Sequence, residues 1–136
     1  MNAMPLSSDL SKLHPKPGHI FRLWQIFLDR VNPLCKVVHS PTLQIQILEA
    51  SANLTDIPKA TEAAMFAIYL LAVTSLGSTE CESLFGENKP TLLTKYRNAS
   101  KSALVAADFK ISEDILVLQA LALYLVSLVL LVQILR

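Results

Sequence analysis

Apolar residues recur at intervals of three and four along most of this chain, which is the period of an amphipathic helix. In the clearest case, over residues 20–31, the apolar positions are Ile20, Leu23, Trp24, Phe27, Leu28 and Val31. No stretch of useful length alternates apolar and polar residues as a half-buried strand does. The pattern therefore predicts an all-α fold, with helices over residues 20–31, 40–53, 58–76, 79–86 and 90–107 and a last one after residue 112.

Proline, glycine and small polar residues mark where these helices are expected to begin and end. The Asn32-Pro33 pair is predicted to stop the first helix, because proline disfavours helical geometry in the residue before it. Thr79 and Glu82 have the spacing of a capping box, and Gly86 is expected to end that helix. Three further N-caps are expected, at Ser40, Asp56 and Ser112.

Two of the predicted helices lack a polar face. Residues 63–73 are apolar on all sides, which predicts a central core helix around which the others pack in an irregular array. Residues 115–135 carry no charge, and only Gln119, Ser127 and Gln133 are not apolar. A helix of this length spans roughly 31 Å, which matches the hydrocarbon core of a bilayer. A small tail-anchored membrane protein held by residues 115–135 is therefore the alternative interpretation.

The polar residues of the last helix favour burial in protein over a membrane anchor. Gln119, Ser127 and Gln133 fall within about 120° of one another on a helical wheel, which gives the helix a narrow polar stripe. Membrane-spanning helices do not need such a stripe. No cluster of positive charge flanks the segment to orient a span.

Residues 1–18 contain several polar residues and prolines and are predicted to form a flexible lead-in without chemistry of its own. They lack the apolar core of a signal peptide. The predicted domain then occupies residues 19–136. A chain of 136 residues has room for one domain of ordinary size.

Composition narrows the class of protein. With 52% apolar and 17% charged residues the chain is not intrinsically disordered. Its 12 basic and 11 acidic residues give a net charge of +1, so no overall positive field marks a nucleic-acid-binding protein. Two cysteines are too few for a disulfide scaffold or a multi-cysteine zinc site.

Candidate chemistry along the chain is weak. Cys35 and His39 have a metal-ligand spacing, but prolines on both sides favour a buried thiol beside a turn histidine. Cys81 in the first turn of a helix is expected to be mildly acidic, yet no histidine follows His39 to act as its base. An acidic cluster is expected to lie in solvent and comprises Glu80, Glu82 and Glu87. A basic stretch is also expected to form a solvated helix face and comprises Lys89, Lys95, Arg97, Lys101 and Lys110. No catalytic, cofactor-binding or metal-ligating residue is predicted, and the chain is not expected to be an enzyme.

Residues 23–34, LWQIFLDRVNPL, together with several later segments, resemble the start of the fungal-specific transcription factor domain, the regulatory middle region of binuclear zinc-cluster regulators. The later positions that carry the likeness are Lys36, His39 and residues 41–43, residues 57–60 leading into 65–72, Leu93, Tyr96, Arg97, residues 106–109 and residues 117–121. The resemblance covers about residues 19–125, and the order and spacing of the segments make it specific. Within it, Trp24 is interpreted as a core residue.

The resemblance implies an all-α regulatory region without catalysis, nuclear in its relatives and frequent in regulators of secondary-metabolite gene clusters. Such regulators bind DNA through an N-terminal cluster of six cysteines, whereas the residues before this domain hold none, so DNA contact is expected to be indirect. The family's domain continues beyond the helix that starts near Ser112, so residues 19–136 are interpreted as a partial domain. Its last helix is expected to expose apolar surface that drives self-association or pairing with a protein partner.

Overall fold

The computed structural model describes residues 10–108 and 114–135, with side chains up to residue 130. Every regular element in these ranges is helical, which confirms the all-α fold class and the long apolar last helix. The elements are a 3-10 turn (Ser11–Leu13), α2 (Pro17–Ile26), a π-helical turn (Phe27–Val31), α3 (Asn32–Cys35), α4 (Ser40–Ala52), α5 (Lys59–Thr74), α6 (Ser78–Phe85), α7 (Lys89–Ala106) and α8 (Ile115–Leu135).

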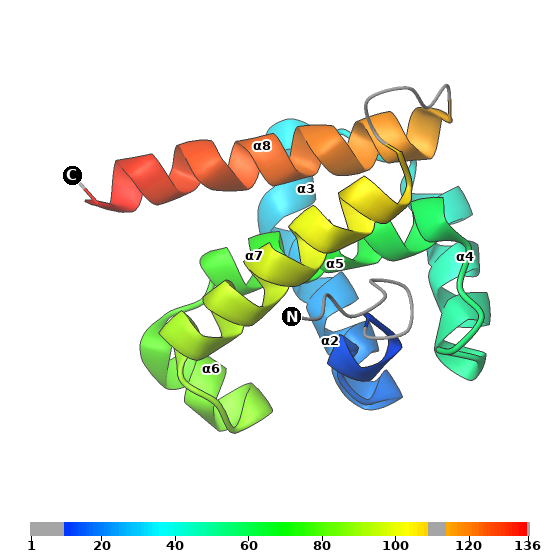
Figure 1. Cartoon of the computed structure of the whole chain (residues 1–136). Helices are drawn as coiled ribbons and strands as arrows, with labels where there is room; N and C mark the ends of the chain where they lie inside the picture. The colour runs from blue at the N-terminus through cyan, green and yellow to red at the C-terminus, as the bar shows by residue number, and fades with distance from the viewer. Residues whose placement is uncertain (1–9, 109–113, 136) are drawn as a thin grey trace, which may run out of the picture.

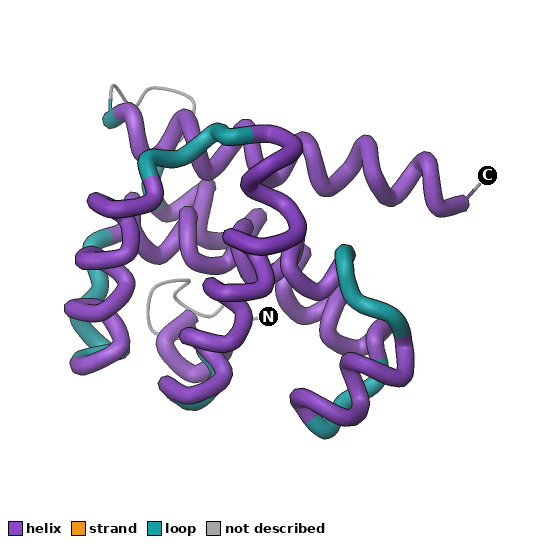
Figure 2. Tube along the Cα trace, turned by 180° about the vertical axis from the view of Figure 1, so that it is seen from behind, coloured by secondary structure: helices purple, strands orange, loops and turns teal. Residues whose placement is uncertain are grey.

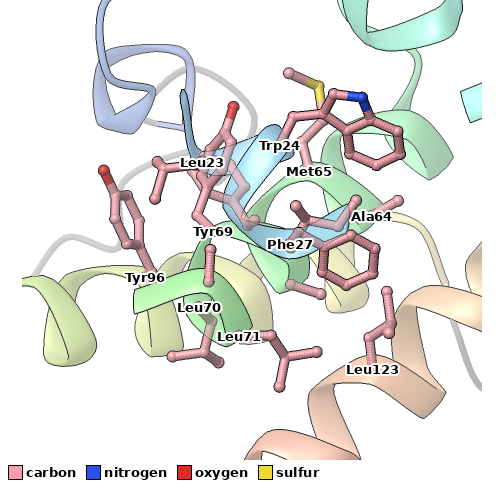
Figure 3. Close-up of a cluster of buried hydrophobic side chains, with 14 of the residues drawn as sticks. Leu23, Trp24, Phe27, Ala64, Met65, Tyr69, Leu70, Leu71, Tyr96 and Leu123 are labelled. Carbon is pink, nitrogen blue, oxygen red and sulfur yellow. The ribbon is translucent and has the colours of Figure 1, made fainter. Parts of the chain in front are cut away.

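Helix α5 lies inside the molecule, with α7 and α8 against it on one side and α2 crossing it on another (Figures 1 and 2). Every residue from Thr61 to Val73 is buried, which explains why this segment has no polar face in the sequence. Leu23, Trp24 and Phe27 of the α2 segment face α5, and Leu123 approaches from α8 (Figure 3). The core thus joins segments that are distant in the sequence.

The chain remains helical across Pro33, so the predicted stop at Asn32-Pro33 is wrong. Asn32 has φ −57° and ψ −37°, and Pro33 occupies the first turn of α3, where a missing N–H costs least. The π-helical turn of residues 27–31, directly before α3, has wider backbone turns than an α-helix. Helical structure ends after Cys35, where Lys36 adopts a left-handed φ of 43°. This short extension carries Leu34 away from the core, to the surface beside α8.

The predicted caps at Asp56 and Thr79 are also wrong. Asp56 does not cap α5, which begins after Pro58 without a side-chain cap. Helix α6 begins one residue before Thr79, and Glu80 rather than Glu82 closes its first turn, accepting a hydrogen bond of 3.0 Å from the Gly77 N–H. The Glu80 side chain thus satisfies one of the backbone N–H groups at the start of the helix.

The predicted end of α6 is confirmed. Gly86 ends α6 with a φ of 73°, as expected for a glycine C-cap. The predicted N-cap at Ser40 is wrong by one residue, because His39 holds the N-cap position and Ser40 is the first residue of α4. Asn88 supplies a cap that the pattern did not predict, accepting a hydrogen bond from the Thr91 N–H at 2.9 Å. The predicted cap at Ser112 lies outside the described residues.

One face of α8 packs on the core. Val117, Ala120 and Leu123 are buried against α5, and Gln119 donates a hydrogen bond of 2.9 Å from Nε2 to the Val37 carbonyl oxygen. Ser127 is buried and donates to the Tyr124 carbonyl oxygen. Two members of the predicted polar stripe, Gln119 and Ser127, therefore form hydrogen bonds with backbone carbonyl oxygens of the protein. The side chain of the third, Gln133, lies outside the described residues.

The membrane alternative rested on the length of the last helix. In the part of the chain that the structure describes, no helix combines the length and the apolar character needed to cross a bilayer. The end of α8 does project beyond the other helices, as both views of the molecule show (Figures 1 and 2).

The described part of the predicted lead-in packs on the core. Leu10 is 2% exposed, His14 is buried, and α2 already begins at Pro17. Residues 1–9 lie outside the described residues. The segment from residue 10 thus contributes to the core, and the domain boundary at residue 18 stays a prediction.

Candidate functional site

An apolar groove runs between α3 and α8. It has a volume of about 480 Å³. Its apolar walls are formed by Val31, Leu34, Cys35, Leu71, Val126 and Leu130, and Arg30, Thr74 and Ser75 add polar atoms. Leu34 lies within α3 and is 86% exposed. The groove therefore opens beside an exposed leucine.

The outward face of α8 continues this apolar surface. Ile115, Leu118, Leu125 and Val129 are exposed, and their spacing places them opposite the buried residues of the same helix. Helix α8 carries no charged residue. We call the surface formed by Leu34, Ile115, Leu118, Leu125, Val129 and Leu130, with the adjoining groove, the α8 surface. Exposed apolar side chains gathered along one helix face make this surface a candidate interaction site.

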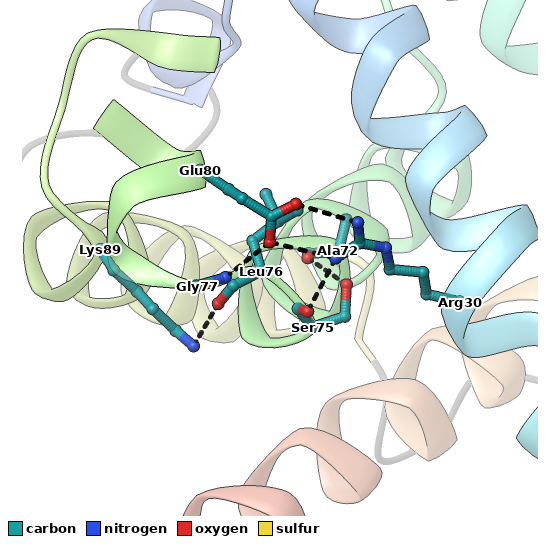
Figure 4. Close-up of polar contacts among 7 residues, drawn as sticks. All are labelled: Arg30, Ala72, Ser75, Leu76, Gly77, Glu80 and Lys89. Atoms are coloured by element: carbon teal, nitrogen blue, oxygen red, sulfur yellow. Dashed lines mark hydrogen bonds and ion pairs between the residues drawn. The ribbon is translucent and has the colours of Figure 1, made fainter. Parts of the chain in front are cut away.

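A second groove, of about 670 Å³, lies between α2 and α6 and is lined by both charged and apolar side chains. Arg30 makes a forked ion pair across it with Glu80, at 3.0 Å from Nη2 to Oε2 and 3.2 Å from Nη1 to Oε1 (Figure 4). Arg30 Nη1 also donates to the Ser75 carbonyl oxygen at 3.2 Å. The Arg30 hydrogen bonds, followed by the one from Gly77, lower the pKa of Glu80 to about 2. Such a carboxyl is ionised near neutral pH and is unsuited to general acid catalysis.

The candidate nucleophile Cys81 is fully buried. Burial, with smaller effects of Glu80 and Glu82, raises the pKa of its thiol. The expectation of a mildly acidic Cys81 is therefore wrong, because loss of hydration outweighs the helix N-terminus and the nearby Lys89. A protonated buried thiol is a poor nucleophile.

Cys35 and His39, which have a metal-ligand spacing in the sequence, lie in different segments of the structure. Cys35 ends α3, and the left-handed Lys36 then turns the chain, so Cys35 and His39 do not share a helix. The Cys35 thiol contacts the Val31 carbonyl oxygen at 3.7 Å. Across the described ranges, no three His, Cys, Asp or Glu side chains gather in a group that could hold a metal ion.

Two basic residues of α7, Lys89 and Lys95, make contacts within the protein. Just after α5, Lys89 Nζ donates to the Leu76 carbonyl oxygen at 2.6 Å (Figure 4). It also donates to the carbonyl oxygen of Thr74, the last residue of α5, at 3.2 Å. Lys95 pairs with Glu87 at 3.1 Å. Lys101 is exposed, and Lys110 lies outside the described residues. Lys89 and Lys95 are therefore engaged within the protein rather than available to a phosphate group.

The sequence analysis missed a buried polar cluster. His14 lies between Glu62 and Tyr69, with Nε2 at 2.9 Å from the Glu62 Oε2 and Nδ1 at 2.9 Å from the Tyr69 hydroxyl. Its ring stacks on Phe66 at 4.3 Å between centroids. Burial is the main reason that the pKa of Tyr69 is raised well above its usual value. The cluster ties the segment before α2 to α5; the one signal for it was Glu62, a lone carboxylate on an otherwise apolar helix.

Trp24 is confirmed as a core residue. It is 3% exposed and stacks on Phe27 with ring centroids 5.8 Å apart. Its indole N–H donates to Gln44 Oε1 at 2.9 Å, which joins α2 to α4. Its polar atom is therefore satisfied inside the fold.

Comparisons with known proteins place the chain in a family. The model of the fungal specific transcription factor domain matches residues 24–131. The aurofusarin cluster transcription factor aurR2 of Gibberella zeae is 49% identical over 89% of this chain and 18% of its own length. The pyriculol/pyriculariol biosynthesis cluster transcription factor 1 of Pyricularia oryzae is 47% identical over 86% of this chain and 16% of its own. The transcriptional regulator AacuB of Aspergillus aculeatus is 48% identical over 88% of this chain and 16% of its own.

No solved structure matches the chain. The chain spans only 16–18% of the length of these three relatives, so the match concerns one region of much longer regulators. That region is the one whose order of segments the sequence resembled, and the family match extends over most of the described helices, including those that form the α8 surface. The chain belongs to the family of the fungal specific transcription factor domain.

Proposed function

We propose that this chain is a regulatory domain that controls a secondary-metabolite gene cluster through protein contacts made at the α8 surface. The family membership supplies the transcriptional role. The names of two relatives refer to the aurofusarin and the pyriculol/pyriculariol clusters, which supports a cluster regulator as the setting. Nuclear localisation follows from the same relationship and is part of the proposal.

The observation that carries the proposal is the exposed apolar face of α8 beside the groove at Leu34. Ile115 is 67% exposed, Val129 60% and Leu34 86%, with no charge on α8. Surface of this kind is costly to leave in water and is suited to a protein partner. The groove between α2 and α6 is a weaker candidate, since Arg30 and Glu80 already pair with each other there.

The proposal excludes catalysis and direct zinc-cluster DNA binding by these 136 residues. Of the titratable groups considered as catalytic, Glu80 is paired with Arg30 and Cys81 is buried. The sequence holds two cysteines, Cys35 and Cys81, whereas a binuclear zinc cluster uses six. DNA is then reached only through a partner regulator.

Chromatin immunoprecipitation of the tagged chain from its fungal host tests this function. We expect recovery of cluster promoters that depends on a co-expressed full-length regulator. Leu125→Glu, on the α8 surface, should abolish recovery, whereas Ile45→Glu, at an exposed position of α4, should leave it unchanged. Zinc-dependent, sequence-specific DNA binding by the purified chain would overturn the proposal, as would recovery without any partner regulator.

A further inference from the structure

The groove between α3 and α8 has walls that are mostly aliphatic. Its volume of about 480 Å³ lies within the range of small-molecule sites, about 300–1,000 Å³. Among the described residues that line it, there is no aromatic ring and no carboxylate. The walls therefore suit the hydrocarbon chain of a small ligand, and nothing in the lining repels a negative charge.

The polar side chains of the groove belong to Arg30, Thr74 and Ser75. The hydroxyls of Thr74 and Ser75 donate to backbone carbonyl oxygens of α5, those of Leu70 and Ala72, at 2.7 Å each. The Ser75 carbonyl oxygen accepts a hydrogen bond from Arg30 Nη1 at 3.2 Å. Because both hydroxyl protons are already used, a polar ligand group in the groove would find its hydrogen-bond donors on Arg30.

The guanidinium of Arg30 has five N–H groups, and its three hydrogen bonds within the protein leave two of them unused. Nη1 donates to Ser75 and to Glu80 Oε1, and Nη2 donates to Glu80 Oε2 (Figure 4). No described residue accepts from the Nε–H or from the second N–H of Nη2. These two donors lie at one edge of the planar group and can bind both oxygens of a carboxylate.

We propose that the groove binds a small aliphatic carboxylate, with its hydrocarbon chain between α3 and α8 and its carboxylate on the free edge of Arg30. The chain would cover Leu34 and Leu130, which are 86% and 37% exposed, and removal of this apolar surface from water favours binding. The negative charge complements Arg30, the one charged group among the described residues that line the groove. Glu80 shares this guanidinium, so the affinity is expected to be modest.

The rate of Cys35 alkylation by N-ethylmaleimide in the full chain tests this site, with octanoate as the probe. Cys35 lines the groove and is partly exposed, whereas Cys81 is buried, so peptide mass spectrometry can follow Cys35 alone. Octanoate should slow the reaction in a saturable way, with a dissociation constant of about 1 mM, which is ordinary for about ten non-hydrogen atoms. Octan-1-ol has the same chain without the charge and should need concentrations at least about threefold higher.

Three substitutions test the role of the guanidinium. Arg30→Gln removes the free edge and should weaken octanoate binding about three- to tenfold, while changing octan-1-ol binding by less than about twofold. Arg22→Gln is the matched control, because Arg22 is an exposed arginine of α2 that does not line this groove. Glu80→Gln removes the competing carboxylate and should tighten octanoate binding. Both Arg30→Gln and Glu80→Gln break the Arg30–Glu80 pair, so opposite effects on binding separate a ligand contact from a loss of stability.

Several outcomes would overturn the ligand site. These are the absence of saturable protection by octanoate, equal protection by octanoate and octan-1-ol, or equal effects of Arg30→Gln and Arg22→Gln. The site goes beyond the proposed function, because the purified chain binds the ligand without a partner regulator. A chain that binds octanoate but never recovers chromatin would support this inference and overturn the proposed function. Recovery of chromatin by a chain that does not bind octanoate would do the reverse.

Discussion

At the scale of single residues, His14 makes the most demanding contacts in the core. Its side chain is fully buried, and its ring nitrogens reach Glu62 and Tyr69 from a segment 48 and 55 residues away. Both ring nitrogens of His14 therefore have a partner, and the Tyr69 hydroxyl can donate to Nδ1 or accept from it. A buried carboxylate that lost this partner would be left without compensation.

His14→Ala should therefore lower the free energy of unfolding by about 2–4 kcal/mol, since Glu62 and Tyr69 would keep buried polar atoms without their partner. Urea denaturation followed by circular dichroism measures this. The control is Lys12→Ala, an exposed position in the same segment, which should change stability by less than about 0.5 kcal/mol. Equal effects of the two substitutions would mean that the cluster contributes nothing.

The Arg30–Glu80 pair predicts a pH dependence in acid. The pKa of Glu80 is about 2 in the folded chain, below the ordinary value of 4.5. A depressed folded pKa gives a stabilising contribution that is fully present above the unfolded pKa and is lost as pH falls from about 4.5 to about 2. The difference in melting temperature between the wild type and Glu80→Gln should thus be constant above pH 5 and shrink toward zero near pH 2.

Glu82→Gln is the matched control for this titration, because Glu82 is an exposed carboxylate on the same helix. Added salt should reduce the Glu80 effect, since both partners of the ion pair are partly exposed, at 42% and 45%. A difference for Glu80→Gln that persists unchanged at pH 2 would rule out the ion pair as its cause.

At the scale of elements, the period of apolar residues predicted the helices well. Each helix buries one face or, for α5, all faces in the core, and the buried positions must be apolar. The ends were harder to predict, since each depends on a contact made elsewhere. Pro33 is tolerated because a π-helical turn precedes it, and the α6 start is set by Glu80, which Arg30 also holds. The His14 cluster joins residues too distant for any local pattern to pair.

The orientation of α8 can be tested with one pair of substitutions. Leu123 is fully buried and Leu125 is 50% exposed, although the two leucines are separated by one residue. Leu123→Ala should cost about 2–4 kcal/mol, because it opens a cavity against α5, whereas Leu125→Ala should cost less than about 1 kcal/mol. Chemical denaturation at a concentration where the chain is monomeric measures both. Similar costs at the two positions would show that α8 packs with a different face.

At the scale of the whole molecule, the candidate surface was foreseen in part. The absence of charge in residues 115–135 predicted exposed apolar surface, and the structure places it on the face of α8 away from α5. The groove beside Leu34 was not predicted, because it needs α3 to continue past Pro33 and to end beside α8. A surface made by two distant segments follows from packing rather than from either segment alone.

The same packing predicts how the molecule opens. Helix α5 is covered by α2, α7 and α8, so exposing its amides requires most of the core to separate. Helix α4 buries only one side, through Leu43, Ile47 and Ala50. Native-state hydrogen exchange should therefore give α5 amides the free energy of global unfolding, while α4 amides exchange through smaller, local openings. The amides of a helix exchange only when the contacts that cover the helix are lost. If α5 amides exchanged as fast as α4 amides, the contacts of α7 and α8 with α5 would not hold the core together.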